Sequence, residues 1–208
     1  MKDINKELKD YIEEKVLPRY GELPGHTIDH IEAVIRRSMR IIEQLDDINA
    51  DMVYTIAAYH DLGRLIDDDT HNIESAKMLR KDEGLKKFFN EDQINTIAEA
   101  VEDHRASLKT EPRSIYGRIV SSADRSDDID EILIRSYQYH RERKPDLTDE
   151  EVVNEVCSHL KKKYASGGYA KMYFSTPEYE AFRQEADRLT KNPQELIEKI
   201  NTLKEKEA

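Results

Sequence analysis

The 208-residue sequence is poor in cysteine, tryptophan, glycine and proline. It has one cysteine, no tryptophan, seven glycines and six prolines. The lone Cys157 can form neither an internal disulfide nor a thiolate zinc site, so disulfide-stabilised and zinc-finger folds are excluded. The few glycines and prolines do not suffice for the many tight turns of a β-sandwich or β-barrel. These absences favour a helical protein.

Long apolar runs are missing as well. No stretch approaches the length of a membrane span, so we expect no membrane partner. The N-terminus, MKDINKELKDYIEEK, is charged throughout and lacks the apolar centre of a secretory signal. We therefore expect a cytoplasmic protein in a reducing compartment.

Basic residues are outnumbered by acidic ones. Lysine and arginine number 33 against 44 aspartates and glutamates, which gives a formal charge of -11. Affinity for nucleic-acid polymers comes mainly from a basic surface, so a general nucleic-acid binder is excluded. A small anionic substrate is still compatible with this net negative charge, provided that the binding site itself is locally positive.

Apolar residues recur at steps of three and four along most of the chain, which is typical of amphipathic helices. The pattern predicts an all-α protein of about nine or ten helices that forms a single domain over residues 1–208. Small apolar residues in 114–126 suggest a central helix there. The expected helices are 5–17, 27–45, 49–64, 72–82, 91–105, 114–126, 129–143, 148–164, 177–191 and 193–206.

Five of the seven histidines fall within residues 26–104. Four of them lie near expected helix ends beside apolar residues, where side chains from separate helices can converge inside a bundle. His60 is followed at once by Asp61, and such a pair can hold one ion from two directions. An exposed or helix-capping pair is the alternative. The five clustered histidines are His26, His30, His60, His71 and His104.

Three motifs extend this pattern: His30 in GHTIDHIEAVIRRS, His60-Asp61 in AAYHDLGR, and Asp124 in IVSSADRSDD. Together they resemble the signature of the HD-domain metal-dependent phosphohydrolases, in which a histidine, a His-Asp doublet and a final aspartate lie on three helices. The resemblance covers residues 25–130 as the metal-site core. Residues 131–208 are then expected to form a C-terminal helical extension packed on that core, loosely similar over 161–189 to small bacterial members.

The resemblance implies His30, His60, Asp61 and Asp124 as metal ligands. In members with two ions, residues placed like His71 and His104 bind the second ion while the doublet aspartate bridges both. Members with one ion can use these histidines to hold the substrate phosphate instead. The implied cofactor is one or two divalent ions, with Mn, Fe, Mg, Ni, Co and Zn not distinguished.

The implied reaction is hydrolysis of a phosphate ester or anhydride by a metal-activated water. Asp61 is the first catalytic candidate. Arg64, one helical turn after His60, is the second, because its planar fork suits a phosphate, although a solvated helix-end arginine is the alternative. Arg105 and Arg125 directly follow proposed ligands and point away from them, so ion pairs with neighbouring acids are expected.

The substrate class is less sharply indicated. We expect a small phosphorylated molecule, with a nucleotide favoured. Two rival interpretations are a di-iron oxygenase of the same fold and a non-catalytic ligand-sensing module. An aromatic segment could stack on a base or simply pack. It comprises Tyr164, Tyr169, Tyr173, Phe174 and Tyr179.

Three other expectations concern residues outside the proposed ligand set. His26 could serve as a proton donor, as a partner of a ligand or as a helix-start residue. His140 and His159 are expected at the surface. The last two helices could complete the core or form a homodimer.

Overall fold

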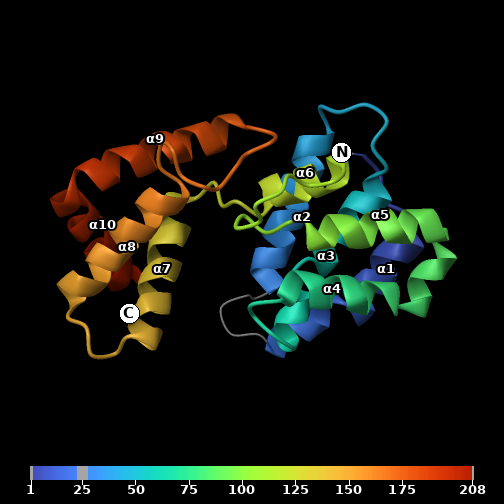
Figure 1. The fold of residues 1–208 in the computed structure, drawn as a ribbon, viewed down its shortest axis with the longest axis horizontal. Helices are drawn as coiled ribbons and strands as arrows, with labels where there is room; N and C mark the ends of the chain where they lie inside the picture. Colours follow the sequence, from blue (N-terminus) through green and yellow to red (C-terminus); the bar gives the residue numbers. More distant parts are fainter. Residues whose placement is uncertain (1, 23–27, 208) are drawn as a thin grey trace. The chain divides into compact units, whose positions relative to one another are not determined.

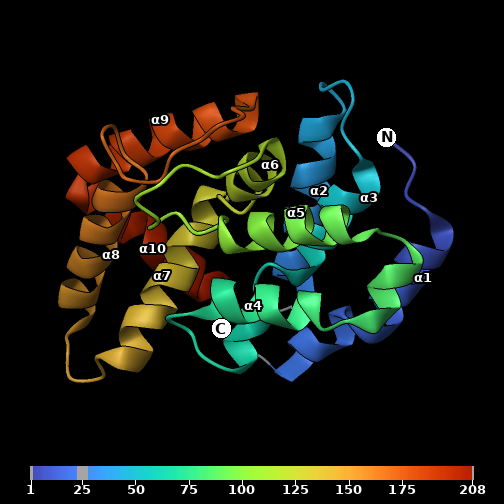
Figure 2. The same cartoon turned by 45° about the vertical axis from the view of Figure 1, so that its right-hand side comes forward.

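The computed structural model describes residues 2–22 and 28–207, apart from the side chains of Glu22 and Glu207. Within these ranges the chain forms ten α-helices and three short 3-10 helices, and no strand (Figures 1 and 2). The all-α prediction is confirmed. Residues 169–174 form no regular secondary structure.

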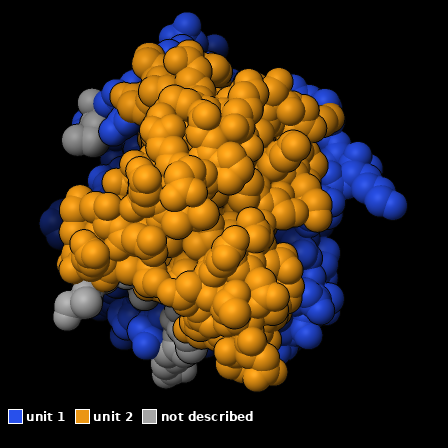
Figure 3. All heavy atoms as spheres, turned by 90° about the vertical axis from the view of Figure 1, so that its left-hand side faces the viewer, with its two compact units in different colours: residues 1–125, 172–174 blue, residues 126–171, 175–208 orange. Residues whose placement is uncertain are grey.

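The chain divides into two compact units, coloured separately in Figure 3. Unit 1 comprises residues 1–125 and 172–174, and unit 2 comprises residues 126–171 and 175–208. The expected core of 25–130 thus gains the N-terminal residues and a short return segment. That residues 1–208 form a single domain, with 131–208 packed on the core, stays a prediction.

Unit 1 is built around one helix that is buried on almost every side. Nine of the ten residues of α3 (Ala50–Tyr59) are buried, because its sequence is apolar or small around nearly its whole circumference. It packs against five other helices of the unit. The helix 114–126, expected to be central, instead exposes Ile115 and Arg118. The neighbours of α3 are α1 (Lys6–Lys15), α2 (Ile28–Ile42), α4 (His71–Arg80), α5 (Glu91–Glu102) and α6 (Ile115–Ala123).

Three 3-10 helices complete unit 1: η1 (Leu17–Glu22), η2 (Leu62–Leu65) and η3 (Glu83–Lys87). The predicted helix 49–64 was too long, since α3 ends at Tyr59 and η2 follows. A Cβ at Gly63 would lie 2.1 Å from the carbonyl oxygen of His71, so only glycine lets this turn pack against α4. The predicted helix 91–105 also ends early, at Glu102. Both shortened helices leave a histidine just beyond their ends.

Unit 2 consists of α7 (Ile129–Arg143), α8 (Asp149–Lys163), α9 (Pro177–Lys191) and α10 (Pro193–Glu207), which pack against one another. Side-chain caps begin α7, α8 and α9. Thr148 forms a capping box with Glu151 at α8, and Thr176 caps α9 with Pro177 in its first turn. Tyr164 and Tyr179 both pack against Phe182, with ring centroids 5.2 and 5.7 Å apart. These aromatic residues therefore form part of the interior of unit 2.

None of the helices in the described part of the chain combines the length and the apolar character that crossing a bilayer requires.

Candidate metal centre

The helices of unit 1 bring six of the predicted site residues together. They form two groups of possible ligands, in each of which the donor atoms lie within 4.8 Å of one another. Five different elements or turns contribute, so the centre depends on the packing of the whole unit. The first group is His30, His60 and Asp124, and the second is Asp61, His71 and His104.

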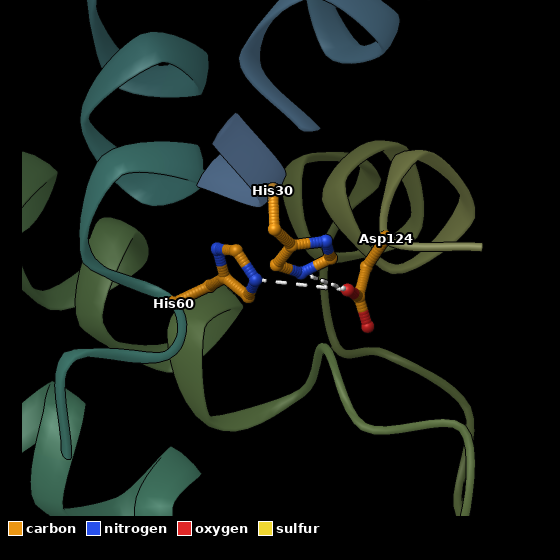
Figure 4. A group of neighbouring side chains, drawn as sticks. All are labelled: His30, His60 and Asp124. Carbon is orange, nitrogen blue, oxygen red and sulfur yellow. Dashed lines mark ion pairs between the residues drawn. The ribbon is translucent and has the colours of Figure 1, made fainter. Parts of the chain in front are cut away.

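The first group converges on one carboxylate oxygen. Oδ1 of Asp124 lies 3.3 Å from Nε2 of His30 and 3.6 Å from Nε2 of His60 (Figure 4). His30 comes from α2, His60 follows the last residue of α3, and Asp124 follows the last residue of α6. Residues far apart in the sequence thus meet because α2, α3 and α6 pack against one another.

The second group converges on Oδ1 of Asp61. This atom lies 3.2 Å from Nε2 of His71 and 3.4 Å from Nε2 of His104, and the two Nε2 atoms are themselves 3.2 Å apart. His71 begins α4, and His104 follows the end of α5.

Asp61 also faces the first group. Its other oxygen, Oδ2, lies 3.6 Å from Nε2 of His60 and 3.9 Å from Nε2 of His30. One carboxylate therefore presents one oxygen to each group. The side chain is 3% exposed, so the group is held away from bulk water.

Three of the histidine rings are oriented by backbone carbonyl groups. Nδ1 lies 2.7 Å from a carbonyl oxygen in each case: Ala57 for His60, Asp68 for His71 and Val101 for His104. A carbonyl oxygen only accepts, so Nδ1 carries the proton and the neutral ring turns the lone pair of Nε2 toward the centre. Metal-binding histidines in proteins are commonly fixed in this way.

Burial and the two carboxylates act against each other on these rings. Burial lowers the pKa of His30 and, with the neighbouring His104, lowers the pKa of His71 to about 4. Burial also lowers the pKa of His60, but the carboxylates of Asp61 and Asp124 outweigh it and raise that pKa overall. Although burial opposes it, contact with His30 and His60 holds the pKa of Asp124 well below its usual value.

Arg64 is placed beside the centre but is already paired with carboxylates. Its Nε lies 3.0 Å from Oδ2 of Asp61, and its Nη1 pairs with Asp68. The ion pair with Asp61 was not foreseen from the sequence. Contact of Arg64 with a substrate phosphate stays a prediction.

Arg125 is buried and links the two groups. Its guanidinium lies 3.3 Å from Oδ2 of Asp124, so the expected ion pair forms, but with the candidate ligand from which Arg125 was predicted to point away. It also donates to the hydroxyl of Ser121 at 2.9 Å and to the carbonyl of His104 at 3.4 Å. Arg105, by contrast, donates to the backbone carbonyl of Asp69.

Sequence reasoning missed two further residues that fix the ends of the ligand-bearing helices. Arg37 of α2 donates to the carbonyls of Ala123 and Arg125, 3.2 and 2.9 Å away, on either side of Asp124. Asn72 donates to the carbonyl of Glu102 at 2.7 Å and so joins α4 to the end of α5. Arg37 lies within the first motif and Asn72 directly follows a predicted ligand, but nothing in the local sequence shows which carbonyls they reach.

The remaining sequence candidates lie elsewhere. His26 falls outside the described residues. His140 and His159 lie in unit 2 and are half-buried rather than on the surface. Tyr173 and Phe174 belong to unit 1, where both backbone N–H groups donate to the hydroxyl of Ser122 at 3.0 and 3.2 Å.

The six-residue arrangement fits divalent ions. Ligand atoms that bind one ion at about 2.0–2.2 Å lie roughly 3–4 Å apart, which matches the spacing within each group. Several lone pairs and carboxylate oxygens facing one another inside a protein repel unless a cation lies between them. Imidazole and carboxylate ligands together suit Zn, Fe, Mn, Ni and Co.

Comparison with known proteins gives one match. Residues 27–129 match a protein-family model described as the HD domain, and this range contains all six residues of the two groups. No curated protein and no solved structure matches the chain.

Proposed function

Because the chain belongs to the HD-domain superfamily of metal-dependent phosphohydrolases, we propose that it hydrolyses a phosphate ester or anhydride of a small molecule. In this proposal His30, His60 and Asp124 would hold one divalent ion, and His71 and His104 would hold a second. Asp61 would contribute one carboxylate oxygen to each.

The observation that carries this proposal is the division of the Asp61 carboxylate between the two groups. Oδ1 faces His71 and His104, while Oδ2 faces His60 and His30. A second role for His71 and His104, donating directly to a substrate phosphate, needs a proton on Nε2. Their Nδ1 protons are already donated to carbonyls, which in the neutral rings leaves Nε2 as a lone-pair ligand.

Each residue of the centre has a defined task in this mechanism. The four histidines and two aspartates would hold the ions. Backbone carbonyls that accept from Nδ1 fix the orientation of three of the histidine rings. A divalent ion, when bound, acidifies water and stabilises negative charge on the transferring phosphoryl group. We propose that the guanidinium of Arg64, which pairs with Asp61 and Asp68, also donates to a phosphate oxygen.

The substrate we propose is a small phosphorylated molecule, with a nucleotide favoured. The chain as a whole is acidic, so an anionic substrate requires local positive charge. Bound cations together with Arg64 would supply it. Mn, Fe, Mg, Ni, Co and Zn are all candidates for the ions.

Phosphate release tests this proposal. Untagged protein, loaded in turn with Mn²⁺, Mg²⁺ and Co²⁺, should release phosphate from at least one member of a panel of nucleotides and generic phosphate esters. Asp124→Ala should abolish that release. Bound iron with an oxygen-dependent spectrum and no phosphate release would favour the oxygenase. An unchanged ligand response in metal-free His60→Ala protein would favour the sensing module.

A further inference from the structure

Tyr20 lies outside the matched range 27–129 and yet reaches the turn that carries two of the proposed ligands. It belongs to η1, which packs against α2 and η2, and its side chain is fully buried. Its hydroxyl donates to the carbonyl oxygen of Ala58 at 2.9 Å. Ala58 stands two residues before His60 and three before Asp61.

The Ala58 carbonyl is at a position where the backbone needs an external donor. The last four carbonyls of an α-helix have no partner in a continuing helix, and Ala57 and Ala58 both lie in the last turn of α3. The carbonyl of Ala57 accepts from the ring of His60, and the carbonyl of Ala58 accepts from Tyr20. A ligand ring and a tyrosine hydroxyl thus complete the end of the same helix.

The far side of the turn is fixed as well. The backbone N–H of Gly63 donates to the hydroxyl of Ser75 at 2.7 Å, which attaches the turn to α4. Between this attachment and that of Tyr20 lie His60 and Asp61. The two ligands are therefore carried by a short segment held at both ends.

We propose that Tyr20 is a positioning residue for the metal centre, whose hydroxyl fixes the turn that presents His60 and Asp61 to both ions. This inference rests on the proposed two-ion centre but not on which ester is cleaved. A group outside the matched HD domain would then set the geometry of its ligands. Loss of the hydroxyl should lower the affinity for both ions, because Asp61 contacts both ligand groups.

The test compares full-length Tyr20→Phe with wild type, using Co²⁺ as the probe. Co²⁺ affinity is measured by competition with a chelator, and the absorption bands of bound Co²⁺ report coordination. We expect an affinity loss of about 10–100-fold, the range typical of groups that orient ligands, together with altered bands. Tyr54→Phe is the matched control. Tyr54 is 5% exposed in α3, the helix whose last turn accepts from Tyr20, and its own hydroxyl bonds to no residue that the structure describes.

A purely structural role gives a different result. Leu17→Ala, in the same 3-10 helix, removes buried apolar contacts without touching the hydroxyl and provides a variant of lowered melting temperature. If Tyr20→Phe lowers the melting temperature of the metal-free protein and leaves affinity and bands unchanged, as Leu17→Ala should, the inference is wrong. Failure of Tyr20→Phe to fold would also count against it.

The outcomes separate this inference from the proposed function. Wild-type protein that binds Co²⁺ but hydrolyses no ester contradicts the phosphohydrolase, and the affinity of Tyr20→Phe still decides the role of Tyr20. Wild-type protein that binds no Co²⁺ overturns both.

Discussion

The interior of unit 1 contains ionisable side chains, whereas the interior of unit 2 is apolar and aromatic. In unit 1, His60, Asp61, His71 and His104 are at most 3% exposed, and Arg125 is buried beside them. In unit 2, residues such as Leu133, Val156, Phe182 and Leu189 fill the space between α7, α8, α9 and α10.

The requirements of folding alone explain the apolar interior of unit 2, but they do not explain the buried ionisable side chains of unit 1. Burying charged groups is costly unless each is paired, and packing apolar residues of similar size is often at least as stable. The interior of unit 2 consists of such packed apolar residues. The centre of unit 1 departs from it at the six residues that could hold metal ions, so its composition requires a function beyond folding.

The largest expected effect comes from removing the charge that both ligand groups share. Asp61→Asn keeps the size of the side chain but weakens both sites at once. We expect the ion affinity and the rate of hydrolysis to fall by more than about 100-fold. This exceeds the loss typical of residues that only orient a metal ligand. Metal content and phosphate release measure this. Asp146→Asn, at an exposed position of unit 2, is the control, and an equal loss there would contradict the comparison.

A smaller effect is expected when only one group is broken. His71→Ala removes a ligand of the second group and leaves His30, His60 and Asp124 in place. The bound metal should fall from two ions per chain to one, with a partial loss of hydrolysis. His140→Ala in unit 2 should keep both ions. Loss of both ions from His71→Ala would show that the groups do not bind independently.

Unit 2 should respond to mutation in the opposite way. Phe182→Ala removes a 3% exposed ring that packs against Tyr164 and Tyr179. The free energy of unfolding should fall by about 3–5 kcal/mol, the usual cost of truncating a buried phenylalanine. Denaturant unfolding measures the loss, and ion affinity measured under folding conditions should stay at the wild-type value. A parallel loss of ion affinity would contradict the assignment of function to unit 1 alone.

The smallest effect concerns acid stability. Burial, followed by the positive charge of Lys163, lowers the pKa of His159 from 6.5 to about 4. The ring therefore takes up a proton more readily in the unfolded chain than in the folded chain. Above pH 6.5 the ring is neutral in both states, and its full contribution to the free energy of unfolding is present. It is lost as the pH falls toward 4. His159→Gln should therefore flatten the decline in the free energy of unfolding between pH 6.5 and 4.

Denaturant titrations of metal-free protein across this range check the result, because bound ions then contribute nothing. If the free energy of unfolding of His159→Gln declined as steeply with pH as that of wild type, the pKa of His159 would not be lowered in the folded chain.

The convergence of the six candidate ligands could be predicted because their signal is local. His60 and Asp61 are neighbours, and His30, His71, His104 and Asp124 lie beside regular apolar patterns whose packing brings helix ends together. The all-α fold and most helix starts were predictable for the same reason, since caps such as Asn49, Asn90 and Thr148 act on backbone groups two or three residues away.

Contacts over long sequence separations were not predictable. The hydrogen bonds of Tyr20 to Ala58, Arg37 to Ala123 and Arg125 to His104 depend on which helix faces bring these residues together. The early end of α3 also escaped prediction, because apolar periodicity continues through Leu62 while the contact of Gly63 with α4 redirects the chain. Positioning residues were thus harder to find than the ligands they support.

The central claim, a two-ion centre bridged by Asp61, is tested most directly by elemental analysis of untagged wild-type protein beside Asp61→Asn. The account predicts two divalent ions per folded chain for wild type and fewer than one for Asp61→Asn. Wild-type protein without bound ions, or Asp61→Asn protein that keeps two, would contradict it.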